Sequence, residues 1–387
     1  MKVLYDFQAY NMQTHGGVSR CMYELYKNLP AGVEGKVAVL ETKNVYLRNE
    51  GIPTSLYDNF ISTRNFKGKE FLYKLFYNIK YNKCRHIKSW PDINCLYSKR
   101  LVEKGDYDVF HPTFFYDYFL GALGSRPFVL TIHDLIPELF PQYFGRDDIQ
   151  IIMRQRLIPR AAHIVAVSEN TKKDVVRLYN VPEEKITVIY HGADEAVYTP
   201  GKNAKYNFPY ILYVGDRNLY KNFVKLVDAA LPVLEAHPEL RIVCTGHPFT
   251  DVEKERFSSL GIEERMKHVF VTDDSEFLDL YHNAVTFVYP SEYEGFGIPI
   301  LEAYRAGCPV MLNNASCFPE IAGDAAVYFN MGENGSDFAK KFEELYAMSS
   351  TEREALVNRQ RERLKMFSWK RSAEQLAQVY RRVVDKK

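Results

Sequence analysis

The chain of 387 residues is poor in cysteine and carries almost no net charge, and each shortage excludes a class of protein. Its six cysteines include no Cys-x-x-Cys pair, so neither a zinc site of that type nor a dithiol redox motif is indicated. The formal net charge of +1 leaves no overall positive field, which argues against a nucleic-acid partner.

Long apolar runs are also missing. No stretch reaches the roughly 18 apolar residues that a membrane-spanning helix needs. The first residues, Met1–Phe7, do not resemble a secretory signal, because the apolar region is short and contains an acid. We therefore expect a protein of the reducing cytoplasm.

The length exceeds one ordinary domain and suits two. Hydrophobic residues make up 46% of the chain and charged residues 26%, which is typical of a globular protein. Apolar strands alternate with helical segments, which predicts an α/β fold with mostly parallel sheets. The segment from Glu195 to Tyr206 is polar and contains Pro200 and Gly201, so we expect the domain boundary there.

The most informative stretch is Pro290–Ala303, which follows an apolar run, Ala284–Tyr289, that predicts a buried parallel strand. Gly295 and Gly297 allow a tight loop with exposed backbone N–H groups. Pro299 suits the first turn of a helix, which we expect to continue to Arg305 and end at Gly307. A strand, a glycine loop and a helix start together predict an anion-binding site.

Two carboxylates, Glu294 and Glu302, flank this loop. A site for phosphate alone has no need of them, whereas a ligand with phosphate and several hydroxyls does, because one carboxylate accepts two hydroxyl hydrogens. A nucleotide sugar is such a ligand. The alternative is a solvated turn with polar surface glutamates, but the glycines, the proline and the apolar strand agree in favouring a ligand site.

Three other loops could face a ligand. Gly16 and Gly17 lie between the expected strand Lys2–Phe7 and a helix, although most such pairs are plain turns. His133 and Asp134 follow the expected strand Pro127–Ile132, where residues face the crevice of an open α/β sheet. That pair could be catalytic or structural. Lys221 follows the strand Tyr210–Gly215, and its alternative role is a solvated surface lysine.

The stretch Ser291–Ala303 resembles the Glu-x7-Glu signature of the retaining glycosyltransferases of family 4, which are two-domain enzymes of the GT-B fold. The segment His133–Pro137, His-Asp-Leu-Ile-Pro, is similar to a branch that contains mannosyltransferases of surface-polysaccharide assembly. The resemblance covers nearly the whole chain and is weakest over Leu40–Leu101. His191 and Ala193 are mild departures from the family pattern.

The resemblance implies a GT-B fold: two Rossmann-like domains that face a cleft. Residues 1–194 would form the acceptor domain and residues 195–368 the donor domain. Residues 369–387 would form a helix that returns to the N-terminal domain. The nucleobase would lie at the junction of the expected strand Val269–Thr272 and the helix that follows it.

The resemblance also implies roles for single residues. His133 and Glu294 would be catalytic: His133 would contact the donor sugar on the acceptor side, and Glu294 would hold sugar hydroxyls near the reacting carbon. Glu302 would hold the ribose. Lys221 would bind the diphosphate, together with Arg217, because Tyr220 stands where the family commonly has arginine. Backbone contacts to the donor would come from the loops, at Gly16, Gly17, Phe296, Gly297 and Ile298.

The implied reaction moves a hexose, mannose from GDP-mannose, with retention onto a glycan or lipid-linked glycan acceptor. No cofactor or metal is expected, because no Asp-x-Asp motif lies where such a donor would need it, and the family uses cations and a helix dipole instead. A UDP-sugar donor and a GT-B nucleotide-sugar epimerase are the alternatives. A two-lobed sugar-binding protein is a third, which would normally carry a secretory signal.

The segment Phe66–Lys88 has a separate character. It contains seven Lys and Arg residues against one acid, Glu70, and its apolar residues recur at helical spacing. Such a helix could lie peripherally on the inner, anionic face of the membrane. Alternatively, it packs its apolar face on the N-terminal domain and leaves its lysines in water.

We predict that this segment binds anionic membranes, with each cation near the surface contributing about 1 kcal/mol within a Debye length. Co-sedimentation with phosphatidylglycerol vesicles should decrease with added salt, and decrease further in a Lys74→Glu, Lys80→Glu double variant. A helix packed on its own domain predicts no lipid dependence, so an absence of binding at low salt would exclude the membrane role.

Overall fold

The computed structural model describes residues 1–52, 93–194, 198–200, 205–217, 219–271, 273–332 and 335–385. The basic segment Phe66–Lys88 lies outside these ranges, as does part of the expected domain boundary, so both remain predictions. Within the described ranges, no helix is long and apolar enough to cross a membrane.

The N-terminal half is built on parallel strands. Two three-stranded sheets have the orders β2-β1-β3 and β4-β5-β6, and a bridge between Phe110 and Phe128 connects β3 to β4. Strands β3 and β4 are buried along their whole length, as expected for parallel strands covered on both faces. The strands are β1 Lys2–Tyr5, β2 Glu34–Val37, β3 Val109–His111, β4 Val129–Ile132, β5 His163–Ala166 and β6 Ile186–Val188.

The C-terminal half contains one six-stranded parallel sheet of order β12-β11-β10-β7-β8-β9, which is the Rossmann arrangement. A short antiparallel pair, β13 and β14, lies beyond its last strand. The strands are β7 Tyr210–Tyr213, β8 Arg241–Cys244, β9 Met266–His268, β10 Thr286–Tyr289, β11 Val310–Asn313, β12 Val327–Phe329, β13 Met331–Gly332 and β14 Gly335–Ser336.

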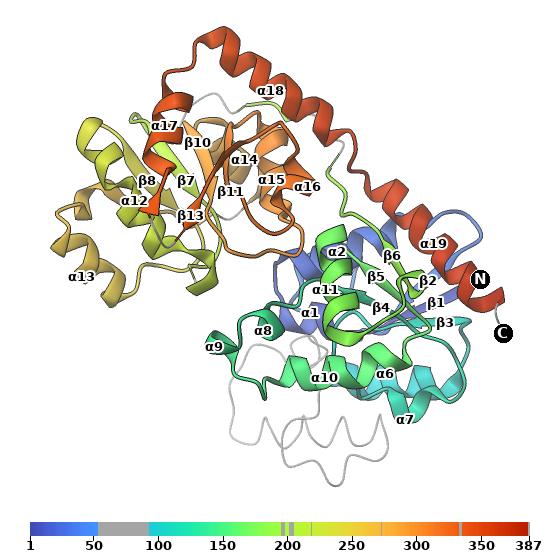
Figure 1. Cartoon of the computed structure of the whole chain (residues 1–387). Coiled ribbons are helices and arrows are strands. Elements are labelled where there is room, and N and C mark those ends of the chain that lie inside the picture. Colours follow the sequence, from blue (N-terminus) through green and yellow to red (C-terminus); the bar gives the residue numbers. More distant parts are fainter. Residues whose placement is uncertain are drawn as a thin grey trace, which may run out of the picture.

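Helices connect the strands of both halves, which form separate bodies in Figure 1. In the first half they are α1 Gln8–Met12, α2 Gly17–Lys27, α3 Val45–Asn49, α6 Ile93–Lys104, α7 Leu120–Leu123, α8 Ile136–Leu139, α9 Pro141–Phe144, α10 Ile149–Leu157 and α11 Glu169–Tyr179. In the second half they are α12 Phe223–Ala236, α13 Asp251–Ser259, α14 Asp274–His282, α15 Ile298–Ala306, α16 Phe318–Ala322, α17 Phe338–Tyr346 and α18 Ser350–Leu364. The expected α/β architecture with two Rossmann-like sheets is confirmed.

Two expected boundaries were wrong. Gly17 was expected to precede a helix, but α2 begins at Gly17 itself, directly after the extended Gly16, and the short helix α1 lies between β1 and this glycine pair. The strand expected at Val269–Thr272 ends earlier, at His268. The neighbouring strand β8 ends at Cys244. The Val269 N–H donates a hydrogen bond to the Cys244 carbonyl, and β8 offers no strand residue beyond this point with which β9 could pair.

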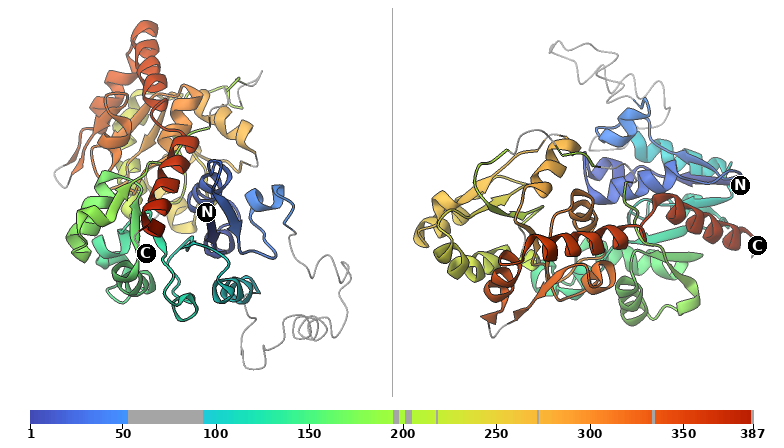
Figure 2. Two further views of the ribbon diagram at one scale, coloured as in Figure 1. Left: turned by 90° about the vertical axis from the view of Figure 1, so that its right-hand side faces the viewer. Right: turned by 90° about the horizontal axis from the view of Figure 1, so that it is seen from above.

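The last helix, α19 (Trp369–Asp385), returns to the N-terminal half as expected. Figures 1 and 2 show α18 beside the C-terminal sheet and α19 continuing onto the body that contains β1. The Tyr380 hydroxyl is buried 2.8 Å from the Tyr5 hydroxyl and 2.5 Å from His111 Nδ1. Burial lowers the pKa of His111 to about 3, so this ring is neutral and depends on hydrogen-bonding partners rather than water.

We predict that Tyr380→Phe destabilises the protein by about 1–3 kcal/mol, because it leaves the buried Tyr5 hydroxyl and His111 Nδ1 without their partner. Denaturant unfolding followed by circular dichroism would measure the change. Tyr346→Phe is the control, because the Tyr346 hydroxyl is exposed and its hydrogen bond to Glu239 is long, at 3.5 Å. Equal stability of the two variants would contradict a structural role for the Tyr380 hydroxyl.

Candidate functional site

The site forms where two loops leave the centre of the C-terminal sheet. Strand β10 pairs with β7 on one side and β11 on the other, and the chain order reverses between β7 and β10. Ligands of open α/β sheets bind at the carboxyl ends of strands at such a switch point. The loops that follow β7 and β10 carry Lys221 and Glu294.

The loop after β10 requires its glycines. Gly297 has φ +95°, a left-handed conformation that side chains rarely adopt, and it caps the start of α15. Gly295 lies so close to the His133 carbonyl that a Cβ atom would be 1.7 Å from that oxygen. The loop of the second half therefore contacts the end of β4 in the first half directly.

Lys221 and Glu294 form an ion pair, with 2.5 Å between Nζ and Oε1. Burial alone would lower the pKa of Lys221, but the Glu294 carboxylate outweighs it, and the pKa is raised. The Asn222 side chain donates to the Pro290 carbonyl, and the Glu292 N–H donates to the Tyr220 carbonyl. The two loops are thus fixed to each other around a charged pair.

Glu302 lies on α15 and has two partners. The Tyr281 hydroxyl donates to Oε2 over 3.1 Å, and Arg20 of α2 donates to Oε1 over 3.3 Å. Burial raises the pKa of Glu302, while Arg20 acts in the opposite direction. Each carboxylate oxygen still has a lone pair for a ligand hydroxyl.

His133 lies directly after β4 and is buried. Burial lowers its pKa to about 4, so its imidazole is neutral near pH 7. Its Nε2 atom is buried without a hydrogen-bond partner. The His133 carbonyl lies against Gly295, the residue that follows Glu294, so the chain positions of the two expected catalytic residues are close across the two halves.

The remaining loop residues also meet at this boundary. Gly17 faces Ile298, where a Cβ on the glycine would lie 3.4 Å from Ile298 Cδ1. Gly16 precedes the first turn of α2 and accepts from the Ser19 hydroxyl. The Phe296 ring packs on His191, with 4.6 Å between ring centroids. Its side chain is therefore engaged with the first half, and only its backbone could contact a ligand.

Arg217 is not brought to Lys221. Its guanidinium forms a 2.6 Å ion pair with Glu253 and donates to the carbonyls of Thr245, His247 and Pro248. The side chain is only 6% exposed, so its donors hold the segment between β8 and α13. The structure does not support the expected pairing of Arg217 with Lys221 on a diphosphate.

Arg20 is a site residue that the sequence reasoning missed. Besides Glu302, it contacts Asp194 Oδ2 at 2.7 Å, and Arg305 contacts the same oxygen at 2.7 Å. Arg20 follows the Gly16-Gly17 pair in the first turn of a helix. This is a position like that of Lys221, a cation after a strand and a loop, and the same argument could have identified it.

Polar contacts join the two halves beside the site. Ser168 caps the start of α11, and its hydroxyl donates to the Gly295 carbonyl over 2.7 Å. The Tyr293 hydroxyl donates to Asp174 over 2.6 Å. The Glu320 carboxylate accepts from the first backbone N–H groups of α11, where a helix dipole favours a negative charge.

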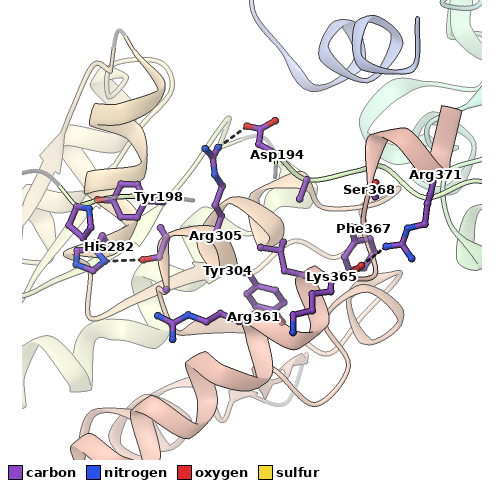
Figure 3. Close-up of a pocket in the computed structure, with 15 residues that line it drawn as sticks. Asp194, Tyr198, His282, Tyr304, Arg305, Arg361, Lys365, Phe367, Ser368 and Arg371 are labelled. Carbon is purple, nitrogen blue, oxygen red and sulfur yellow. Dashed lines mark hydrogen bonds and ion pairs between the residues drawn. The ribbon is translucent and has the colours of Figure 1, made fainter. Parts of the chain in front are cut away.

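Two cavities lie on either side of Asp194. The smaller, of about 50 Å³, includes Arg20, Glu302, Ile298 and the Asp274 and Phe277 side chains of α14. This places it at the junction where the nucleobase is expected. The larger, of about 680 Å³, is shown in Figure 3: Arg305 reaches Asp194 at one edge, and three further cations line the rest, namely Arg361, Lys365 and Arg371.

Comparisons with known proteins agree with this architecture. Residues 15–197 match the family model described as Glycosyltransferase Family 4, and residues 195–363 match the one described as Glycosyl transferases group 1. The two matches are consecutive and cover both halves of the chain.

Two similar relatives are O-antigen chain mannosyltransferases. Mannosyltransferase B of Escherichia coli is 29% identical over 268 residues, which cover 65% of this chain and 70% of that one. RfbU of Salmonella typhimurium is 28% identical over 207 residues, which cover 54% and 58%.

Among solved structures, sucrose-phosphate synthase from Thermosynechococcus elongatus is similar over 100% of this chain and 99% of its own, with a TM-score of 0.70 at 17% identity. Anabaena HepE in complex with UDP and glucose is similar over 98% of both chains, with a TM-score of 0.68 at 18% identity. At these identities the likeness shows the fold, which is the expected GT-B arrangement.

We predict that Lys221→Ala and Glu302→Ala each weaken the binding of a nucleoside diphosphate by about 2–4 kcal/mol, the range for a buried charge-assisted contact. Calorimetric titration with GDP and with UDP would measure it. Lys225→Ala is the matched control, because Lys225 pairs with Glu292 one turn further along and is 57% exposed. Unchanged affinity in both test variants would remove the donor site from this half of the chain.

Proposed function

Because the chain belongs to the family 4 glycosyltransferases with the GT-B fold, we propose that it is a retaining hexosyltransferase that transfers mannose from GDP-mannose to a glycan or lipid-linked glycan acceptor in surface-polysaccharide synthesis. One observation carries the proposal. The Lys221–Glu294 pair lies in the loops that follow the central strands, and the next residue, Gly295, lies against the His133 carbonyl at the end of β4.

The donor diphosphate binds to Lys221 and the first turn of α15. The Lys221 ammonium has three donors, and only one is needed for Glu294. Helix α15 begins in the loop that follows β10, and the positive end of its dipole favours an anion there. Glu302 holds the ribose hydroxyls, and its contacts with Tyr281 and Arg20 keep its carboxylate oriented.

The sugar lies between the halves, with its hydroxyls on Glu294 and its acceptor side toward His133. The bond from the anomeric carbon to the diphosphate oxygen breaks, and a bond to the acceptor oxygen forms on the same face. The acceptor proton passes to the departing phosphate oxygen. Lys221 and the helix dipole offset the negative charge that develops on the leaving group, and these groups take the place of a metal ion.

Two observations bear on the choice of donor. The mannosyltransferase relatives support mannose. The neighbouring structure that contains UDP and glucose supports the second candidate, a UDP-sugar donor on the same fold. For either donor we propose that the base is contacted by Asp274 and Phe277, which line the smaller cavity beside Glu302. We also propose that the enzyme acts in the cytoplasm, at the inner face of the membrane if its acceptor is lipid-linked.

The test is a screen of GDP- and UDP-sugars with acceptor glycans, with and without EDTA. We predict turnover with GDP-mannose, an α-linked product, and equal rates after chelation. Loss of turnover in EDTA that magnesium or manganese restores would exclude the metal-independent mechanism. Conversion of the donor without any glycan present would instead indicate an epimerase.

A further inference from the structure

Three side chains come together beside the site, and only one of them, His133, takes part in the proposed reaction. Cys21 comes from α2, His133 from the end of β4 and His191 from the segment after β6. The Cys21 sulfur and one ring nitrogen of each histidine lie within 4.8 Å of one another. Cys21 Sγ is 3.2 Å from His191 Nδ1, and the three residues are 0%, 8% and 6% exposed.

This donor set selects a class of metal ion. One sulfur and two imidazole nitrogens suit Zn²⁺ and similar thiophilic ions, whereas Mg²⁺ and Mn²⁺ prefer oxygen. Tetrahedral zinc holds sulfur at ~2.3 Å and nitrogen at ~2.1 Å, so its ligand atoms are roughly 3.5 Å apart. The Cys21–His191 separation is close to that spacing, and three protein ligands leave the fourth position open.

An unsatisfied nitrogen is the second observation. His133 Nε2 is buried and has no hydrogen-bond partner, although a buried polar atom of this kind is normally satisfied. Its neighbour His191 is held in place by Phe296 and by Trp369, at 4.6 and 5.8 Å between ring centroids. The His191 ring is therefore positioned before any ion binds.

We propose that Cys21, His133 and His191 form an inhibitory site for a thiophilic divalent cation such as Zn²⁺. On binding, a sulfur–metal bond replaces the S–H bond of Cys21, the thiol proton passes to solvent, and two nitrogen–metal bonds form without any change of oxidation state. Binding holds His133 away from the sugar and stops transfer. The inhibition rests on the proposed function, but the binding itself does not.

The experiment titrates the full chain, first freed of metal with EDTA, with Co²⁺ and then with Zn²⁺. One Co²⁺ per chain should bind and give a thiolate-to-cobalt absorption band, which one equivalent of Zn²⁺ abolishes. Mg²⁺ should give neither effect. Transfer from the donor that proves active should decrease with zinc and recover with EDTA.

Cys21→Ser should eliminate the absorption band and reduce zinc affinity by at least about tenfold, while activity without zinc is retained. Cys308→Ser is the matched control, because Cys308 is equally buried but lies in the other half. His191→Asn, which keeps a polar atom near the place of Nδ1, is a second ligand variant if Cys21→Ser fails to fold by circular dichroism.

Each outcome separates the two proposals. No cobalt band in the wild-type chain, or the same zinc affinity in Cys21→Ser and Cys308→Ser, overturns the metal site and leaves a packed thiol–imidazole pair. A band without inhibition retains the site and overturns its regulatory role. A band in a chain that transfers no sugar retains the site and points to failure of the proposed function.

Discussion

The ion pair between Lys221 and Glu294 determines where everything else in the site lies. Strands β7 and β10 are adjacent in the sheet, so their loops emerge side by side, and the buried pair, the Asn222 side chain and one backbone hydrogen bond hold the loops together. A buried charge whose partner is removed is costly, so neither residue is free to change alone. In this fixed loop, Gly295 packs closely against the His133 carbonyl, which is a direct contact between the two halves.

The contacts between the halves are both aromatic and polar: Phe296 packs on Tyr190 and His191, Phe140 packs on Tyr220 and Tyr293, and polar contacts lie beside them. Ser168 to Gly295, Tyr293 to Asp174, Glu320 to the start of α11 and Arg20 to Glu302 are each exchangeable for water. A hydrogen bond contributes only about 0.5–1.5 kcal/mol net, since water replaces it when it opens. The polar contacts therefore orient the two halves, while the aromatic packing beside them contributes the apolar part of the boundary.

Local patterns were sufficient for much of the fold. The strand before Pro290, the glycine loop and the helix ending at Gly307 were predictable, because each depends on residues close in sequence. The return of α19 to the first half was expected only from the family resemblance. The partners of Arg217 come from a separate loop between β8 and α13, so its structural role was not visible. The position of Arg20 after a strand and a glycine loop could have identified it as a site residue, but its partners Asp194 and Glu302 are distant in the chain and could not be predicted.

The same limit applies to the thiol–imidazole cluster. Cys21, His133 and His191 are separated by more than a hundred and by more than fifty residues, so no spacing motif relates them. Only the parallel order of the first sheets brings the ends of β4 and β6 to one edge, with α2 beside them. A search for Cys-x-x-Cys pairs addresses sites within one loop and cannot detect ligands contributed by three elements.

The return of α19 has a consequence for how the protein is made. The core around Tyr5 and His111 is completed by Tyr380, yet the ribosome builds β1 first and α19 only after the whole C-terminal sheet. The N-terminal half therefore leaves the ribosome with an apolar groove uncovered, at translation speeds of roughly 5–20 residues per second. During that interval chaperones have a binding surface on the nascent chain, and the two halves finish folding as a pair rather than one after the other.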